Sequence, residues 1–218
     1  MADDVDPQRL LTALTTEHFT LQGARAQTTS EATSRAALYI MAVSSTLIAL
    51  GFIAQASEAG DLFNVFSLVV LPTLYIIGIF TFVRMSENSE EDVVYGRAIN
   101  RIRHHYIELA GDQALLFMMT ANDDSLGVLR NMGLTPSRTR PYLTAAYMIA
   151  VVNSVIGGSA VGLAIAATGD PPLWIPVAAG GVAAILSLFL MHRSEMARFQ
   201  RLGGFQEVLF PSPERRAE

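Results

Sequence analysis

The sequence of 218 residues contains no cysteine. Disulfide frameworks, thiolate zinc sites and cysteine nucleophiles are therefore excluded. Lysine is also absent, so all fifteen basic residues are arginine. Together with the high alanine content, this usage is typical of a GC-rich bacterial genome, and we expect a bacterial protein.

Charge is missing from four long segments. Residues 36–57, 62–83, 142–169 and 171–191 contain no aspartate, glutamate, arginine or lysine. A helix of about 20 apolar residues crosses the hydrocarbon core of a bilayer. A helix on the surface of a soluble protein keeps a polar face, which these segments lack. The sequence therefore predicts an all-α integral membrane protein with four transmembrane helices arranged as two hairpins.

The arginines predict how the chain is threaded. Three precede the first span, seven lie between the second and third spans, and five follow the fourth. The short connections at 58–61 and around Asp170 contain none. Basic residues near span ends stay in the cytoplasm, so both termini and the middle segment are expected there, in the bacterial inner membrane. Tyr39, Tyr142 and Trp174 are expected to anchor span ends at the membrane interfaces.

The hydropathy pattern divides the chain into five expected segments: a cytoplasmic N-terminal helix (1–35), a transmembrane hairpin (36–83), a cytoplasmic helical segment (84–141), a second hairpin (142–191) and a cytoplasmic C-terminal tail (192–218). The cytoplasmic parts are expected to be helical, because none shows the period-two alternation of a strand.

Local cap signals refine the expected helices outside the spans. Ser89 with Asp92 is typical of a capping box, which predicts a helix that starts there and ends near Gly111. Asp123 or Asp124 is expected to cap a second, short helix that ends at Gly133. A further short helix is expected in the tail, closed by the glycine pair 203–204.

Four stretches carry a resemblance: "GARAQTTSEATSRAALY", "RAINRIRHHYIELAG", "VLRNMG" and "MIAVVNSVIGG". They resemble blocks of a family of actinobacterial four-span membrane proteins, and the resemblance covers most of the chain. It implies a four-span membrane fold. No activity is established for that family, so no functional residue is carried over.

The predicted spans contain no ionisable side chain. Pumps and ion-coupled transporters place such groups inside the membrane, which weighs against those classes. Asn64, Asn153 and Ser154 remain as polar candidates, either for lining a pore or for hydrogen bonding between packed helices. Gly158 and Gly162 form a G-x-x-x-G pair that lets helices approach closely, either within one subunit or between subunits of a homo-oligomer.

The segment "YGRAINRIRHHYIEL" predicts an amphipathic helix with a basic stripe. Arg97, Arg101 and His105 share one face and are candidate contacts for an anion or for lipid head groups. The adjacent histidines project about 100° apart, so no metal site is expected. Three of the chain's twenty carboxylates lie in the outer connections, so the parts expected in the cytoplasm carry fifteen arginines and seventeen carboxylates. This balance is slightly acidic, and no nucleic-acid binding is expected.

Motifs of common enzymes are absent. The chain has no G-x-S-x-G, no H-E-x-x-H, no Walker loop and no paired-aspartate prenyl motif. We therefore expect no catalytic residues and no cofactor. The favoured hypothesis is an oligomeric inner-membrane channel or pore gated by its cytoplasmic helices. The alternative is a membrane scaffold or sensor that binds a cytoplasmic protein partner, and a lipid-acting enzyme comes third.

Overall fold

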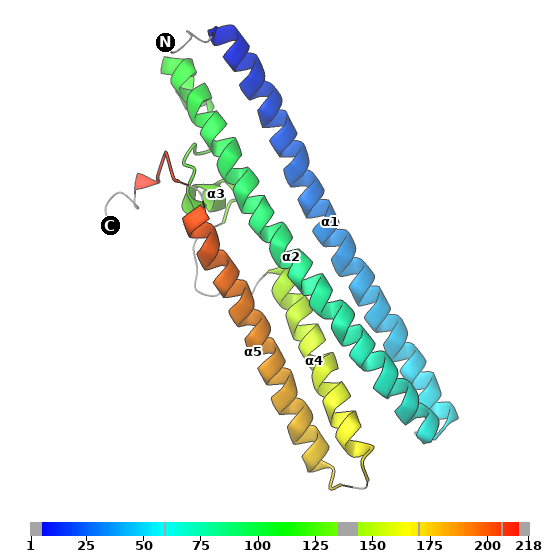
Figure 1. Ribbon diagram of the computed structural model, residues 1–218. Helices are drawn as coiled ribbons and strands as arrows, with labels where there is room; N and C mark the ends of the chain where they lie inside the picture. The colour runs from blue at the N-terminus through cyan, green and yellow to red at the C-terminus, as the bar shows by residue number, and fades with distance from the viewer. Residues whose placement is uncertain (1–5, 59, 135–143, 170, 206, 214–218) are drawn as a thin grey trace. The chain divides into compact units, whose positions relative to one another are not determined.

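The computed structural model describes residues 6–58, 60–134, 144–169, 171–205 and 207–213 (Figure 1). Its elements are α1 (Pro7–Ala56), α2 (Asp61–Ala110), the 3-10 helix η1 (Gly111–Leu116), α3 (Ser125–Asn131), α4 (Ala145–Ala166) and α5 (Trp174–Phe205). The described ranges contain no strand, which confirms the all-α prediction.

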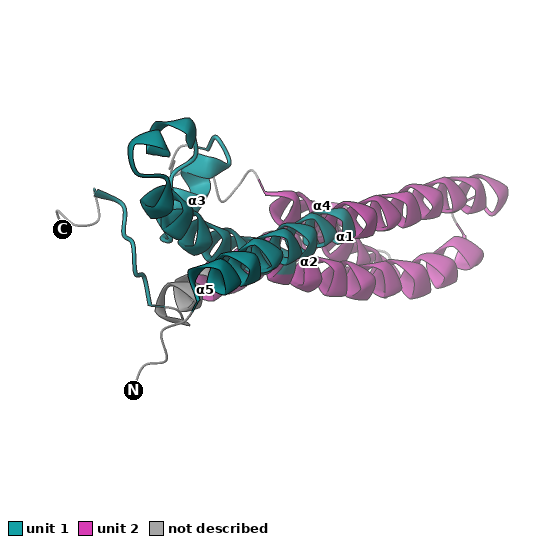
Figure 2. Ribbon diagram, turned by 90° about the horizontal axis from the view of Figure 1, so that it is seen from above, with its two compact units in different colours: residues 1–31, 88–138, 202–218 teal, residues 32–87, 139–201 magenta. Residues whose placement is uncertain are grey.

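The chain divides into two compact units, coloured separately in Figure 2. The polar unit comprises residues 1–31, 88–138 and 202–218. The apolar unit comprises residues 32–87 and 139–201. Helices α1 and α2 each belong to both, because each runs unbroken for 50 residues.

Two expected helix boundaries are wrong. No helix starts at Ser89, which lies inside α2. A cap signature stabilises a helix end only where the preceding backbone is non-helical, and here the helix arrives already formed from the apolar segment. The tail likewise has no separate helix, because α5 continues to Phe205 through the glycine pair.

Helices α1, α2, α4 and α5 are long and apolar enough to cross a membrane. Their outer faces carry large apolar side chains, among them Phe52, Phe80 and Ile185, which are 68%, 70% and 72% exposed. Such contiguous apolar exposure is unfavourable in water and suits a lipid environment. These features indicate a membrane protein.

The core of the apolar unit draws on all four of these helices. Tyr39 and Val43 of α1, Leu74 of α2, Ile149 of α4 and Met191 of α5 belong to one buried cluster. The four apolar helices therefore share one buried cluster, and only a minor part of each apolar window is covered.

The polar unit is ordered by short-range caps. The Asp124 side chain accepts a hydrogen bond from the Gly127 amide at 2.7 Å and caps α3, so that the cap is the second of the two expected aspartates. Gly111 and Gly133 follow α2 and α3 with positive φ angles of 51° and 69°, which confirms both predicted ends. Helix α3 packs closely on α2, since a Cβ atom on Gly96 would lie 2.8 Å from Val128 Cγ1.

Candidate functional site

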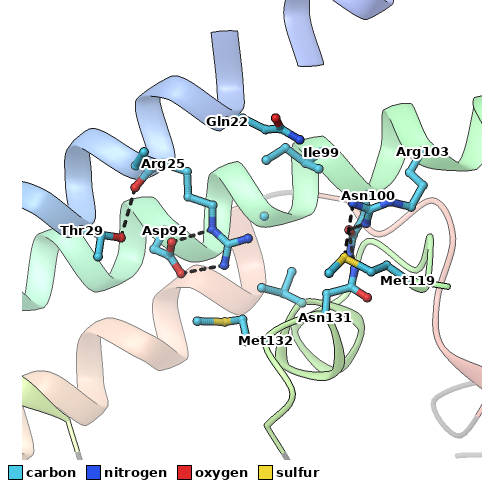
Figure 3. A pocket seen from close by; sticks show the side chains of 13 residues that line it. Gln22, Arg25, Thr29, Asp92, Ile99, Asn100, Arg103, Met119, Asn131 and Met132 are labelled. Atoms are coloured by element: carbon cyan, nitrogen blue, oxygen red, sulfur yellow. Dashed lines mark hydrogen bonds and ion pairs between the residues drawn. The ribbon is translucent and has the colours of Figure 1, made fainter. Parts of the chain in front are cut away.

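The polar unit contains a cavity of about 460 Å³ (Figure 3). Its wall is built from α1, from α2, from the loop before α3, and from α3 with its C-terminal cap. The lining residues are Gln22, Arg25, Ala26, Thr29, Asp92, Gly96, Ile99, Asn100, Arg103, Met119, Val128, Asn131 and Met132. Ligand pockets of proteins commonly have volumes of roughly 300–1,000 Å³, so the cavity is of suitable size for a small molecule.

One face of α2 forms the floor of this cavity. Asp92, Gly96, Ile99 and Arg103 follow one another at intervals of three or four residues, which places them on one side of the helix. Opposite them, Arg25 of α1 makes a forked pair with Asp92, with Nε to Oδ1 at 2.6 Å and Nη2 to Oδ2 at 3.1 Å. This bidentate geometry fixes α1 on α2 at one end of the cavity.

An amide network forms the other end. Asn100 is 2% exposed, and its Oδ1 accepts from Arg103 Nη1 at 2.7 Å and from Asn131 Nδ2 at 2.8 Å. Asn131 Nδ2 also donates to the Thr120 carbonyl at 2.8 Å. The Thr120 amide in turn donates to Asn131 Oδ1 at 2.9 Å. The network joins α2, the loop and α3, so this wall is rigid and polar.

The charge at this end is basic. Burial lowers the pKa of Arg103, and repulsion from Arg25 lowers it further. Burial also lowers the pKa of His18, with a smaller contribution from the positive charge of Arg103. His18 is hydrogen bonded to Gln22, a lining residue, at 2.8 Å. Burial therefore favours the neutral form of His18 beside this end of the cavity.

The C-terminal segment 207–213 is bound to the loop before α3, and we call this contact the tail clamp. Asp123, which is fully buried, accepts from the amides of Phe210 at 2.8 Å and Leu209 at 3.1 Å. The Asp123 amide donates back to the Phe210 carbonyl at 3.1 Å. Arg101 Nε pairs with Asp123 Oδ2 at 2.6 Å.

Asp124 holds the last described turn of the tail. Its carboxylate accepts from the Ser212 amide and from the Ser212 hydroxyl, both at 2.8 Å. The His104 ring stacks on Phe210, with centroids 3.6 Å apart. Burial alone would raise the pKa of Asp123, but the bonds from Arg101 and from the two tail amides hold this pKa below its ordinary value.

Two members of the basic stripe identified in the sequence, Arg97 and Arg101, contact Asp123, and none of its three residues lines the cavity. Arg97 is 5% exposed and donates from Nε to the Asp123 carbonyl at 2.7 Å, so Arg97 and Arg101 both serve the tail clamp. His105 is half-buried on α2. Sequence reasoning missed Arg25 and Arg103, which line the cavity. The spacing of Asp92, Gly96, Asn100 and Arg103 carried the signal, because polar and small residues at helical intervals are typical of a contact face.

In the apolar unit, Asn153 is fully buried, and its Oδ1 accepts from the Tyr39 hydroxyl at 2.9 Å. Asn153 Nδ2 has no partner among the described residues. Gly78 makes room for this bond, because a Cβ atom there would lie 2.0 Å from Asn153 Oδ1. Tyr39 is 2% exposed in this helix contact, and its position at a membrane interface stays a prediction. Tyr142 lies outside the described residues.

Of the other polar candidates, Ser154 lies in a helix contact, and Asn64 takes part in a bond within its own helix. The Ser154 hydroxyl donates to Ser187 at 3.2 Å, and Ser187 is bonded to the Tyr75 hydroxyl at 2.8 Å. Asn64 is half-buried near the start of α2, where its carbonyl accepts from the Ser67 hydroxyl at 3.0 Å. Asn153 and Ser154 therefore bond within the chain rather than facing an open space.

The glycine pair of α4 packs on α5 of the same chain. A Cβ atom on Gly158 would lie 2.5 Å from the Gly180 carbonyl oxygen, and one on Gly162 would lie 3.0 Å from the Pro176 carbonyl oxygen. The two backbones therefore approach closely along this face. Contact with a second copy of the chain is not needed to account for either glycine.

Sequence reasoning also missed Glu195, a buried carboxylate of α5. It is 1% exposed, and the Thr144 hydroxyl donates to its Oε1 at 3.3 Å. Among the described residues, no cluster of three or more His, Asp or Glu side chains is arranged to hold a metal ion. Glu195 therefore offers no metal site together with other described residues.

Comparison of the chain with protein-family models, with curated proteins and with solved structures finds no match.

Proposed function

We propose that this protein is a membrane-anchored sensor, whose polar unit lies in the cytoplasm and binds a small ligand in the cavity between α1, α2 and α3. In this proposal the four apolar helices span the bacterial inner membrane, with both termini inside, as the arginine distribution favours. The sensor acts as a homo-oligomer and presents its C-terminal tail to a cytoplasmic protein partner.

The observation that carries this proposal is the polar cavity itself. Charged and amide side chains converge there on a space of about 460 Å³, whereas Asn153 and Ser154 of the apolar helices bond to other side chains of the chain. Convergent polar groups in a cavity of this size are the usual marks of a ligand site.

A short chain of hydrogen bonds joins the cavity wall to the tail clamp. Asn100 Nδ2 donates to the Asn122 carbonyl at 2.7 Å, and Asn122 Nδ2 donates to the Pro211 carbonyl at 3.1 Å. A ligand that binds Asn100 or its neighbours therefore changes the stability of the loop that holds the tail. The tail is then the output element of the sensor, released or retained by the occupancy of the cavity.

The test is hydrogen exchange of the full chain in nanodiscs, with pools of neutral, cationic and anionic small molecules. Occupancy should slow exchange in residues 117–124, and Ala26→Phe, which fills the cavity without removing a polar contact, should abolish the effect. Gly23→Phe is the matched control on α1, because a Cβ atom there meets nothing within 4 Å. Absence of any protection with every pool would contradict the sensor proposal.

A pore remains the second candidate, and one observation favours it. Ser44 and Ser45 are exposed on the apolar part of α1, so an oligomer could present their hydroxyls to a shared lumen. Single-channel recording in planar bilayers tests this candidate. It requires a conductance that the double variant Ser44→Leu/Ser45→Leu reduces. A membrane that stays silent with correctly inserted protein would rule it out.

A further inference from the structure

We infer that the cavity binds a small organic anion, whose phosphate or carboxylate group is held by Arg103 at the amide-lined end. This inference rests on the proposed sensor function and names the class of its ligand.

The charges that line the cavity do not balance. Arg25, Asp92 and Arg103 are its charged residues. Arg25 and Asp92 neutralise each other through their forked pair. Arg103 has no carboxylate within ion-pair distance among the described residues, and its partners there are Asn100, the Thr120 carbonyl and Met119. A half-buried arginine with only neutral partners attracts an anion more strongly than an exposed one, because solvent screens it less.

Arg103 also retains hydrogen-bonding capacity. A guanidinium carries five N–H donors in a planar fork. Its hydrogen bonds use Nη1 twice and Nη2 once, the latter to the Met119 sulfur at a long 3.8 Å. A phosphate or carboxylate oxygen is a far better acceptor than a thioether. An entering oxyanion would therefore replace the sulfur contact and gain a charge-assisted bond.

The cavity is long enough to hold more of a ligand than its anionic group. Asp92 and Arg103 are eleven positions apart on α2, about 16 Å along the helix axis, and lie at opposite ends of the site (Figure 3). Between them Ile99 and Met132 supply apolar surface. The arrangement fits an organic anion whose body lies on this surface, with a polar end reaching the Arg25–Asp92 pair. Inorganic phosphate alone would leave most of the cavity unfilled.

Phosphate could come from a free metabolite or from a lipid head group, so the experiment has two arms. In the first, the full chain in phosphatidylcholine nanodiscs is titrated with glycerol 3-phosphate, succinate, glycerol and choline at matched ionic strength. In the second, phosphatidylglycerol replaces part of the lipid and no free anion is added. Thermal unfolding and hydrogen exchange of residues 117–124 are measured in both arms.

We expect the anions to stabilise the wild type, with glycerol and choline inactive. Arg103→Gln should weaken anion binding by roughly tenfold to a hundredfold, because charge-assisted bonds are lost. Arg9→Gln is the control for loss of one arginine of the same unit, since the Arg9 side chain is 87% exposed and distant from the lining residues in sequence. An Arg103-dependent effect confined to the second arm also supports the inference and identifies a lipid phosphate as its source.

Two results would overturn the inference. The first is no anion-dependent protection of residues 117–124 in wild type in either arm, which needs no variant to fold. The second is an anion effect of equal size in wild type and in the Arg103→Gln variant or, if that variant is unstable, in an Arg103→Met variant. Protection by glycerol or choline that Ala26→Phe removes would refute the anion inference while leaving the sensor function intact.

Discussion

The tail clamp allows a quantitative test of how the polar unit holds its C-terminal segment. Asp123→Asn keeps the shape of the side chain but removes its charge and replaces one acceptor oxygen with an NH₂ group. In the wild type, Oδ1 accepts from the Phe210 amide at 2.8 Å, and Oδ2 accepts from the Leu209 amide at 3.1 Å and from Arg101. An asparagine has one acceptor oxygen, so it can accept either from the Phe210 amide or from the Leu209 amide and Arg101, but not from all three. We therefore expect local release of the tail rather than unfolding of the whole chain.

The magnitude follows from the bonds lost. A hydrogen bond to a charged group contributes about 1.5–3 kcal/mol. The Arg101 pair contributes less, about 1 kcal/mol or below, because the arginine side chain is 34% exposed. Losing one charged bond and weakening the pair thus costs roughly 3 kcal/mol, or about a hundredfold in the ratio of clamped to released tail.

Hydrogen exchange of the Leu209 and Phe210 amides measures this ratio directly. Exchange should accelerate about a hundredfold in Asp123→Asn, because roughly 3 kcal/mol of the clamp's stability is lost. Asp112→Asn, an exposed aspartate of η1 in the same unit, should leave exchange unchanged. Equal protection of both amides in wild type and Asp123→Asn would refute the assignment of Asp123 as the main holder of the tail.

The remaining predictions concern the apolar unit, its orientation and the pH response of the clamp. Gly78→Ala should lower thermal stability by about 1–3 kcal/mol, because its Cβ atom would lie 2.0 Å from Asn153 Oδ1, whereas Gly51→Ala, with nothing within 4 Å, should be neutral. Gly158→Leu should reduce the folding yield in detergent, because the new side chain clashes with Gly180. Gly181→Leu is the control, since a Cβ atom there meets nothing within 4 Å. A Gly158→Leu variant that folds properly but dissociates into smaller species would instead place this face between subunits. A cysteine at Gly60 should react with an impermeant reagent outside intact cells and one at Gln8 should not; labelling at Gln8 would overturn the proposed orientation. The pKa of Asp123 is lowered in the clamped state, so its contribution to the stability of the clamp is fully present above the ordinary carboxyl pKa and is lost as pH falls through the lowered pKa. Protection of the tail amides should therefore stay constant from about pH 8 to about pH 5 and decline only below about pH 4. Hydrogen exchange corrected for intrinsic rates measures this protection.

Sequence patterns predicted the features that depend on local chemistry. The uncharged segments located the apolar helices, since hydropathy over about 20 residues is a property of each segment alone. A cap at Asp123 or Asp124 and the glycine ends at Gly111 and Gly133 were likewise predicted, because each depends on a few adjacent residues, although only the structure shows that Asp124 is the cap. The capping-box signature at Ser89 misled for the same reason: its local chemistry does not reveal that a helix is already running through it.

The cavity required information that a single helix does not contain. Arg103 faces a site only because Asn131 and Thr120, far along the chain, fold back to the same end of α2. Arg97 and Arg101 look equivalent to Arg103 in sequence, yet they bind Asp123 and hold the tail. Which arginine of a basic helix pairs internally and which faces a cavity depends on the partners that tertiary contacts supply.

The same dependence on distant partners explains why a pore was favoured from sequence. An asparagine in the middle of an apolar helix costs several kcal/mol when its polar atoms are left unpaired in lipid, so a water-filled lumen is one way to satisfy it. The apolar unit uses another way: Gly78 opens a space between α2 and α4, and Tyr39 donates into that space to Asn153. Three residues, each unremarkable in its own helix, together remove much of the need for water. A polar residue in an apolar span is therefore evidence for a pore only after glycines and hydroxyls at the same depth of the neighbouring helices have been considered as its partners.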